Sequence, residues 1–258
     1  MTADRRPVPD VDRLFAGWSV VPSLGPRQPR LATLPVTLRE ALEIAASARS
    51  AERPFRVGLA CGYTPLHLET FLRARLVREF PDRDIAVVKG LYGDVLGALR
   101  EIAAGQQPQA ILVSLEWQDF DPRLGHRALG GWTPGTLPSV LESAGERAAA
   151  LARAIGESAA VARTVVCGPT IEMAPIDHAP SSVSSLFVLE LERILADILA
   201  QAARSGAMVC GSAGRTAMAA ENRGYDARSD LHAGFPFTRE HADKLACAFV
   251  DALRPENP

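Results

Sequence analysis

Asp230 and His232 lie two residues apart, shortly before a predicted C-terminal helix, and they are the strongest candidate for acid–base chemistry in this chain. A carboxylate beside an imidazole can orient the ring and stabilise its charged form, as a general base requires. Asp226 is a second candidate partner for the imidazole. Loop polarity and helix capping are the competing, purely structural interpretation of the same residues.

A second candidate is the segment ACGYT (60–64), in which an apolar run ends in small residues and is followed by a predicted helix. Such a turn lets backbone amides face a ligand, and the helix N-terminus favours negative charge. The Cys61 thiol becomes a nucleophile if that field lowers its pKa. The alternative is a buried, inert cysteine at a tight turn.

Two further segments supply hydrogen-bonding groups. Gly93 precedes a predicted helix, and its amide can donate to an oxyanion, with a glycine turn capped by Asp94 as the alternative. In SLEWQDFD (114–121), Gln118 can both donate and accept hydrogen bonds, which suits substrate positioning, and Asp119 adds a carboxylate. A solvated acidic loop is the competing interpretation of this segment.

The other histidines show no metal-binding pattern. His67, His126, His178 and His232 share no ligand spacing, and His241 is expected on the surface of a helix, so no metal is predicted. The nucleotide-binding patterns GxGxxG and GxxxxGK[ST] are also missing from the sequence, so no cofactor is predicted.

Composition narrows the class of protein. The chain has 258 residues, 47% of them hydrophobic and 22% charged, as in an ordinary globular domain. The net charge of −2, without any long run of like charges, disfavours nucleic-acid binding. Four widely spaced cysteines without a CxxC pair favour a reducing cytoplasm. No signal peptide is recognised and no apolar run reaches the length of a membrane span, so no membrane partner is expected.

The elements that must position these residues alternate along the chain. Apolar runs predict five strands, at 55–61, 84–88, 110–115, 163–169 and 207–211. Helices are predicted between them, with capping signals at Thr37, Ser139 and Thr238. Because parallel strands need crossovers, the sequence predicts an α/β fold of three layers, flavodoxin-like, with a five-stranded, mainly parallel sheet. This domain covers 36–258 and follows an N-terminal arm over 1–35. Ligands of such sheets bind beyond the carboxyl ends of the strands.

Taken in order, the four segments resemble the sequence blocks of the SGNH (GDSL-type) hydrolase superfamily. ACGYT lies at the place of the block GDSxT, with Gly62 at the position of the nucleophilic serine. KGLYGDVLGAL resembles the second block and gives Gly93 the oxyanion role, and Gln118 lies where the third block has asparagine. Asp230-Leu231-His232 fits the short form of the last block. The resemblance implies an acyl-ester hydrolase or acyltransferase.

The chain resembles the N-terminal SGNH-like domain of FkbH-like proteins more closely. The similar pieces are LACGYTPLHLETFLRARL, ILVSLEWQDF and YDARSDLHAGFPFTREHADKLA. The last piece resembles a D-x-x-G-H-x-P-[FY]-T segment, but Gly234 lies at the histidine position and the histidine comes earlier, at His232. This resemblance implies a small acyl-bearing substrate, carried on an acyl carrier protein, in a bacterial biosynthetic pathway.

The glycine at position 62 leaves three explanations open. Cys61 replaces the serine as a displaced nucleophile; or His232 and Asp230 activate water while Gly62, Gly93, Gln118 and Asp119 hold the substrate; or the domain is a non-catalytic module that docks a carrier protein or a phosphatase-like partner. A flavodoxin-type mononucleotide binder is a further alternative, based on the expected sheet order alone.

Overall fold

The computed structural model describes residues 35–47, 54–91, 93–105, 107–128, 133–174, 185–210 and 224–254. The predicted N-terminal arm lies outside the described residues except for Pro35, and Trp132 and His178 also lie outside them. No helix in these ranges is both long enough and apolar enough to cross a membrane.

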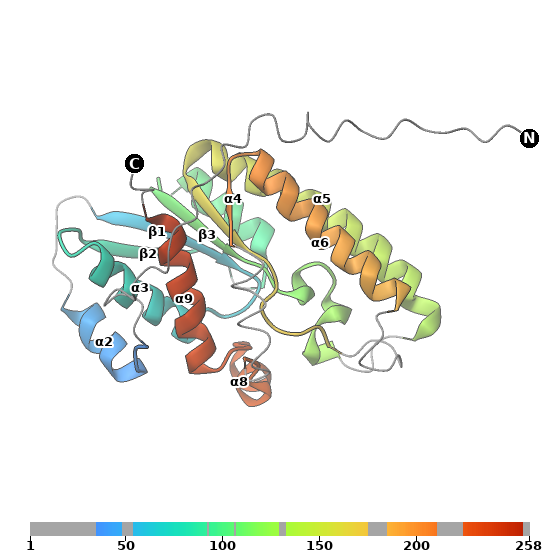
Figure 1. Cartoon of the computed structure of the whole chain (residues 1–258), viewed down its shortest axis with the longest axis horizontal. Helices are drawn as coiled ribbons and strands as arrows, with labels where there is room; N and C mark the ends of the chain where they lie inside the picture. The colour runs from blue at the N-terminus through green and yellow to red at the C-terminus, as the bar shows by residue number, and fades with distance from the viewer. Residues whose placement is uncertain are drawn as a thin grey trace, which may run out of the picture.

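A five-stranded parallel sheet forms the centre of the molecule (Figure 1). Its strands are β1 (Phe55–Cys61), β2 (Ile85–Lys89), β3 (Ala110–Ser114), β4 (Arg163–Cys167) and β5 (Met208–Val209), in the order β2-β1-β3-β4-β5. Every pairing is parallel, which confirms the predicted α/β class and sheet. From β1 the chain continues to β2 on one side of the sheet, and then crosses to β3 on the other side of β1. In such folds, ligands bind in the crevice between the carboxyl ends of the two strands at which the order reverses, here β1 and β3.

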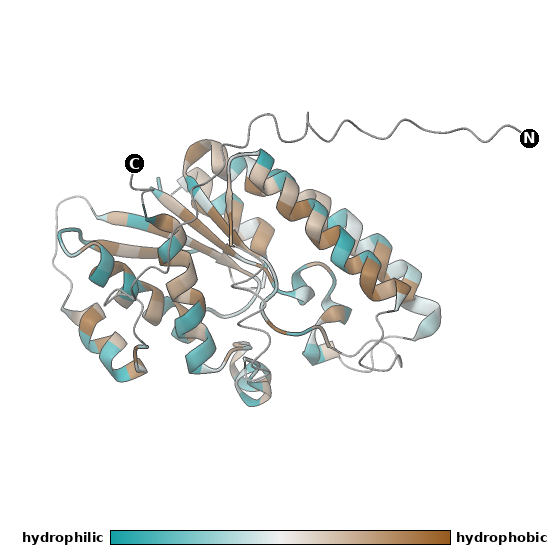
Figure 2. Cartoon of the chain, viewed as in Figure 1, coloured by the Kyte–Doolittle hydropathy of each residue, from teal (hydrophilic) through white to brown (hydrophobic). Residues whose placement is uncertain are grey.

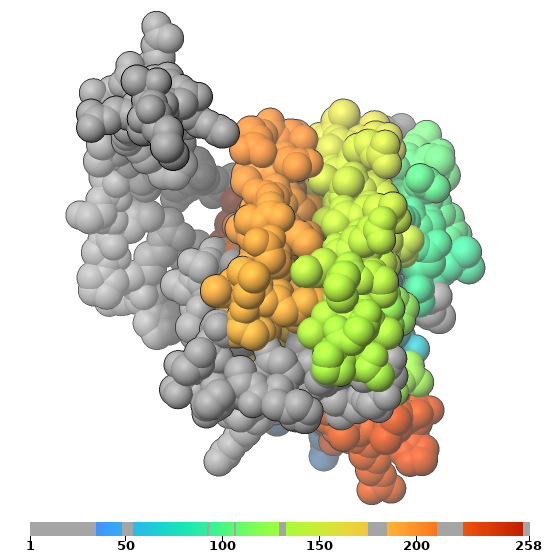
Figure 3. All heavy atoms as spheres, turned by 90° about the vertical axis from the view of Figure 1, so that its right-hand side faces the viewer, coloured from blue at the N-terminus to red at the C-terminus, as the bar shows by residue number. Residues whose placement is uncertain are grey.

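Helices cover both faces of the sheet (Figure 1). The first face carries α2 (Leu38–Ala46), α3 (Leu66–Glu79) and α9 (Arg239–Leu253), and the second carries α4 (Val95–Gly105), α5 (Leu137–Val161) and α6 (Leu186–Arg204). Figure 3 shows α5 and α6 side by side on the outside of the second face. A short helix, α8 (Ala227–Ala233), precedes α9 at the carboxyl edge of the sheet.

Alternate residues of the central strands pack into two separate cores. In β3, Ala110 and Leu112 contact the α3 and α9 side, whereas Ile111 and Val113 contact the α4, α5 and α6 side. All four side chains are buried, as expected for a strand with helices on both faces. The middle parts of the strands are accordingly apolar, with polar residues such as Arg56, Lys89 and Arg163 near the strand ends, while the helices alternate between apolar and polar faces (Figure 2).

Two predicted helix starts are confirmed and one is wrong. Thr37 caps α2 in a capping box with Glu40, and Thr238 caps α9 through the backbone N–H of His241. Ser139 does not cap α5, because this helix begins at Leu137 with a proline in its first turn, where the missing N–H needs no partner. The helix also continues past Gly156, whose bare Cα faces the Ser205 side chain at the end of α6.

Candidate functional site

The turn after β1 and the segment before α9 meet at the carboxyl edge of the sheet. The backbone N–H of Thr64 donates to the carbonyl of Gly234 over 3.0 Å. The Tyr63 ring packs edge-on against Phe237, with ring centroids 4.9 Å apart. These two stretches, far apart in the sequence, therefore lie at the same rim of the sheet.

Gly62 lies directly against the carboxylate of Asp119. A Cβ atom built on Gly62 would overlap Oδ1 of Asp119 and would lie 2.7 Å from its Cγ. The space in which a serine side chain would stand is therefore filled by a carboxylate from the segment after β3.

Cys61 is buried at the end of β1. Its Sγ donates to the carbonyl oxygen of Tyr63 over 3.2 Å. Burial raises the pKa of the thiol to about 12, so the field of the following helix does not produce a thiolate here. The protonated thiol has little nucleophilic character at neutral pH.

Glu116 and Asp119 are buried, so the interpretation of this segment as a solvated acidic loop is wrong for both. Glu116 accepts hydrogen bonds from the backbone N–H and hydroxyl of Thr170 (3.1 and 2.8 Å) and from the N–H of Ile171 (3.3 Å). Oδ2 of Asp119 accepts from the N–H of Glu116 over 2.7 Å. Burial raises the pKa of Glu116 to about 8 and that of Asp119 to about 7. Together the two carboxyl groups tie the segments after β1, β3 and β4 to one another.

His241 is buried, which corrects the expectation that it lies on the helix surface. Its Nε2 lies 2.9 Å from the hydroxyl of Thr170, and its ring stacks on Phe237. The sequence held a signal for this, because His241, Leu245 and Phe249 recur every four residues and form the apolar stripe of α9.

Thr170 links the Glu116 carboxyl group to His241, so we expect Thr170→Val to lower the free energy of unfolding by about 1–2 kcal/mol. The substitution keeps the shape of the side chain but removes a buried hydroxyl that contacts both partners. Urea unfolding measures the effect, with the buried Thr164→Val as a control at the other end of β4, where the hydroxyl bonds only to the carbonyl of Ala162. Equal free energies of unfolding for the wild type and Thr170→Val would show that the hydrogen bonds of Thr170 do not stabilise the fold.

Asp230 lies in α8 and is 2% exposed. The hydroxyl of Tyr225 donates to Oδ2 over 3.0 Å. Oδ1 has no hydrogen-bond partner in the described parts of the chain, and Nε of Arg127 lies 3.9 Å from it. Sequence reasoning missed Tyr225, which no motif marks.

His232 is exposed on α8, and the described residues include no hydrogen bond between it and Asp230. Side chains two residues apart on a helix do not face each other, so the helical conformation separates the predicted pair. Gly93 stands in an exposed turn before α4 with a positive φ of 79°, and no described atom lies within 4 Å of where its Cβ would be. The structure brings Cys61, Gly62 and Asp119 together, but these three residues do not line the pocket described next, and neither do His232 and Gly93. Of the predicted site residues, Gln118 and Asp230 line it.

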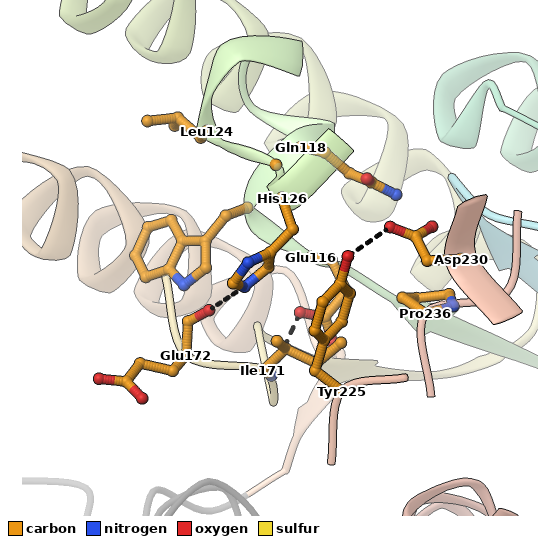
Figure 4. A pocket seen from close by; sticks show the side chains of 11 residues that line it. Glu116, Gln118, Leu124, His126, Ile171, Glu172, Tyr225, Asp230 and Pro236 are labelled. Atoms are coloured by element: carbon orange, nitrogen blue, oxygen red, sulfur yellow. Dashed lines mark hydrogen bonds between the residues drawn. The ribbon is translucent and has the colours of Figure 1, made fainter. Parts of the chain in front are cut away.

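A pocket opens beside these residues, beyond the ends of β3 and β4 (Figure 4). It encloses about 310 Å³ of empty space, counting the part open to solvent. Polar residues line it at Glu116, Gln118, His126, Glu172, Tyr225 and Asp230, and apolar residues at Trp117, Leu124, Ile171 and Pro236. The carboxylate of Glu172 points away from the pocket (Figure 4). His126 stacks on Tyr225 with centroids 4.2 Å apart, and its Nε2 lies 3.1 Å from the carbonyl of Glu172. Within the described ranges, no three His, Cys, Asp or Glu residues are grouped so as to hold a metal ion.

Comparisons with known proteins support the fold alone. No protein-family profile matches the chain. No curated protein matches it either. Among solved structures, the chain is similar to the N-terminal part of the protein BF1531 from Bacteroides fragilis, which contains a phosphatase domain and was crystallised with Mg; the TM-score is 0.61 at 12% identity, over 84% of this chain and 56% of that chain. A second match is BT4096, described as a gut microbial diltiazem-metabolizing enzyme, with a TM-score of 0.45 at 15% identity over 81% and 48% of the two chains. The chain thus spans about half the length of these two solved chains. At 12% identity, the likeness to the first of them shows a shared α/β architecture.

Proposed function

We propose that this chain is a binding module with an SGNH-like fold, which holds a small acyl-bearing group in the pocket at the strand ends and forms no covalent acyl intermediate. One observation carries the proposal. The SGNH resemblance places the nucleophile at Gly62, where the carboxylate of Asp119 fills the adjoining space, and the FkbH-like resemblance places the histidine at Gly234. His232, which fits the short form of the SGNH block, is exposed on α8 and does not line the pocket. Neither glycine brings a reactive group, and Cys61 is held as a buried thiol.

The partner that presents the acyl group is part of the proposal. The resemblance to FkbH-like proteins favours an acyl carrier protein, acting in a bacterial biosynthetic pathway. The Bacteroides fragilis chain of similar fold contains a phosphatase domain, and the present chain matches 56% of its length. A phosphatase-type enzyme acting on the same carrier is therefore the second partner that we infer.

Hydrolysis by an activated water is the second candidate function, and the raised pKa values favour it. With a pKa of about 7, Asp119 is partly ionised at neutral pH and has the basicity that a general base needs. Its Oδ1, however, packs against Gly62, and its Oδ2 already accepts the N–H of Glu116. Asp119 therefore has little room for a water, and binding without turnover agrees better with the contacts.

Assays with p-nitrophenyl esters of short acids and with acyl-pantetheine thioesters separate the two candidates. We expect no turnover above the buffer rate, no initial burst of nitrophenolate, and identical traces for Cys61→Ala and His232→Ala. Calorimetry on the same thioesters is expected to show saturable binding. Turnover that Asp119→Asn abolishes would establish the hydrolytic alternative, and a chain that neither binds nor cleaves any acyl compound would contradict both.

A further inference from the structure

Arg127 holds its guanidinium group beside the buried carboxylate of Asp230, on the side that faces away from the pocket. Oδ2 of Asp230 accepts the Tyr225 hydroxyl, and Oδ1 points away from it (Figure 4). Nε of Arg127 lies 3.9 Å from Oδ1, which is within the range of an ion pair but too far for a hydrogen bond. The side chain of Asp230 is 3% exposed and that of Arg127 is 50% exposed. The buried charge therefore positions the guanidinium, whose outer N–H groups face solvent and a possible ligand.

The same guanidinium borders the position at which the FkbH-like segment has its histidine. That position is Gly234, which ends α8 with a left-handed φ of 68°, a conformation that glycine favours. A Cβ atom at Gly234 would lie 3.8 Å from Nη1 of Arg127 and 3.1 Å from Oγ1 of Thr64. A histidine exchanges protons near neutral pH, whereas an arginine stays charged. The space that an imidazole would take is thus bordered by two hydrogen-bond donors, and it suits the binding of an anion better than proton transfer.

The N-terminus of α3 adds further donors beside this space. Thr64 lies two residues before α3, and its backbone N–H donates to the carbonyl of Gly234 over 3.0 Å, which holds the start of the helix against the end of α8. This helix of 14 residues has no side-chain cap. The N–H groups of such an uncapped end point out of the helix and favour a negative charge.

The charges around this helix end also favour an anion. Arg239, the exposed first residue of α9, lies close to the first turn of α3, because its charge, after burial, lowers the pKa of His67. The carboxyl groups nearby already have partners: Glu69 pairs with Lys89 over 2.7 Å, and Asp226 accepts a backbone N–H as the cap of α8. They therefore do not cancel the positive charge that an incoming ligand meets.

We propose that Arg127, Thr64 and the first turn of α3 bind a phosphate ester group of the ligand. This inference rests on the proposed binding function and adds a charged anchor next to the pocket that holds the acyl part. The planar fork of a guanidinium matches two phosphate oxygens, and such charge-assisted hydrogen bonds are stronger than neutral ones. The phosphate belongs either to the phosphopantetheine arm of a carrier protein or to a free phosphate ester.

Two compounds that differ by one phosphate group, 4′-phosphopantetheine and pantetheine, test the site. Both are titrated at pH 7.5 and low salt, and binding is followed by calorimetry or protein NMR. We expect the phosphorylated compound to bind about tenfold more tightly or better, and the difference to shrink as salt is added. Phenyl phosphate separates the two sources of the phosphate: weaker binding than that of 4′-phosphopantetheine assigns the site to a carrier arm, and equal or tighter binding assigns it to a free phosphate ester.

Variants of the two side chains test their roles. Arg127→Gln should weaken 4′-phosphopantetheine binding about tenfold or more and leave pantetheine binding unchanged, and Arg127→Lys should recover only part of the loss, because it keeps the charge without the fork. Thr64→Val keeps the shape of the side chain and should weaken binding several-fold. Arg153→Gln removes the same charge from an exposed position on α5 and is the matched control, with wild-type binding expected.

The comparison on the wild-type chain decides the matter even if Arg127→Gln fails to fold. Equal affinities for 4′-phosphopantetheine and pantetheine would overturn the phosphate site and leave the proposed binding function standing. Equal losses in Arg127→Gln and Arg153→Gln would also overturn it, since net charge alone would then explain the effect. Turnover of acyl esters, with the preference for the phosphorylated compound intact, would contradict the proposed function and leave the phosphate site standing.

Discussion

Restoring a serine at position 62 is expected to destabilise this protein rather than to activate it. In Gly62→Ser the new Cβ would overlap Oδ1 of Asp119, so the carboxylate must leave its buried place. That movement breaks the hydrogen bond from the N–H of Glu116 and forces side chains apart in a packed region. Together these losses should lower the free energy of unfolding by about 3 kcal/mol or more, measured by urea denaturation.

A double-mutant cycle separates the overlap from other effects of the serine. Asp119→Ala removes the carboxylate, so we expect Gly62→Ser to cost much less in that background than in the wild type. Gly145→Ser is the matched control, because no described atom lies within 4 Å of a Cβ at that helical position. None of these variants should gain esterase activity, since Gly234 still supplies no imidazole. Wild-type stability in Gly62→Ser would show that the space beside Gly62 is free.

Much of the fold could be predicted because each strand is a short apolar run. Burial on both faces makes such runs stand out, and β1 and β4 begin at the predicted residues. Because helices alternate with these strands, a parallel sheet could be predicted as well. The start of α5 could not be located from Ser139 and Glu142, because a capping pattern inside a helix looks the same as one at its start.

The sequence predicted which segments come together at the candidate site, but not how their side chains are oriented. Topology brings the end of β1 and the stretch before α9 to one edge, but side-chain direction depends on local conformation. Asp230 and His232 were predicted to interact on the assumption that they lie in a loop. They lie in the helix α8, where side chains two residues apart point in different directions. The packing of Asp119 against Gly62 joins residues 57 positions apart, and neither residue type signals it. The interior position of His241, by contrast, was visible in the periodicity of its own helix.

Stability is expected to fall as the pH rises from about 4 to about 8. Burial raises the folded-state pKa of Glu116 from 4.5 to about 8 and that of Asp119 from 3.8 to about 7. Between the unfolded and folded values the native chain binds more protons than the unfolded chain, so the free energy of unfolding decreases with pH. Both protons are bound below pH 4, and their stabilisation is lost by pH 8, an effect on the order of a few kcal/mol. Urea unfolding at pH 5 and pH 8 measures it.

Replacing one carboxyl group at a time by an amide shows how much of the pH dependence of stability comes from Glu116 and how much from Asp119. Glu116→Gln cannot ionise yet keeps an oxygen for Thr170, so its stability should change less up to pH 8, and Asp119→Asn should do the same up to pH 7. Glu142→Gln alters an exposed carboxyl group outside this network and serves as the matched control. Asp121 acts in the opposite direction: although burial raises its pKa, hydrogen bonds from Arg123 lower it overall, so its contribution is lost only in acid. A wild type that grows more stable from pH 5 to pH 8 would mean that Glu116 and Asp119 are ionised in the folded chain, and then Asp119 would be available as the base that the hydrolytic alternative requires.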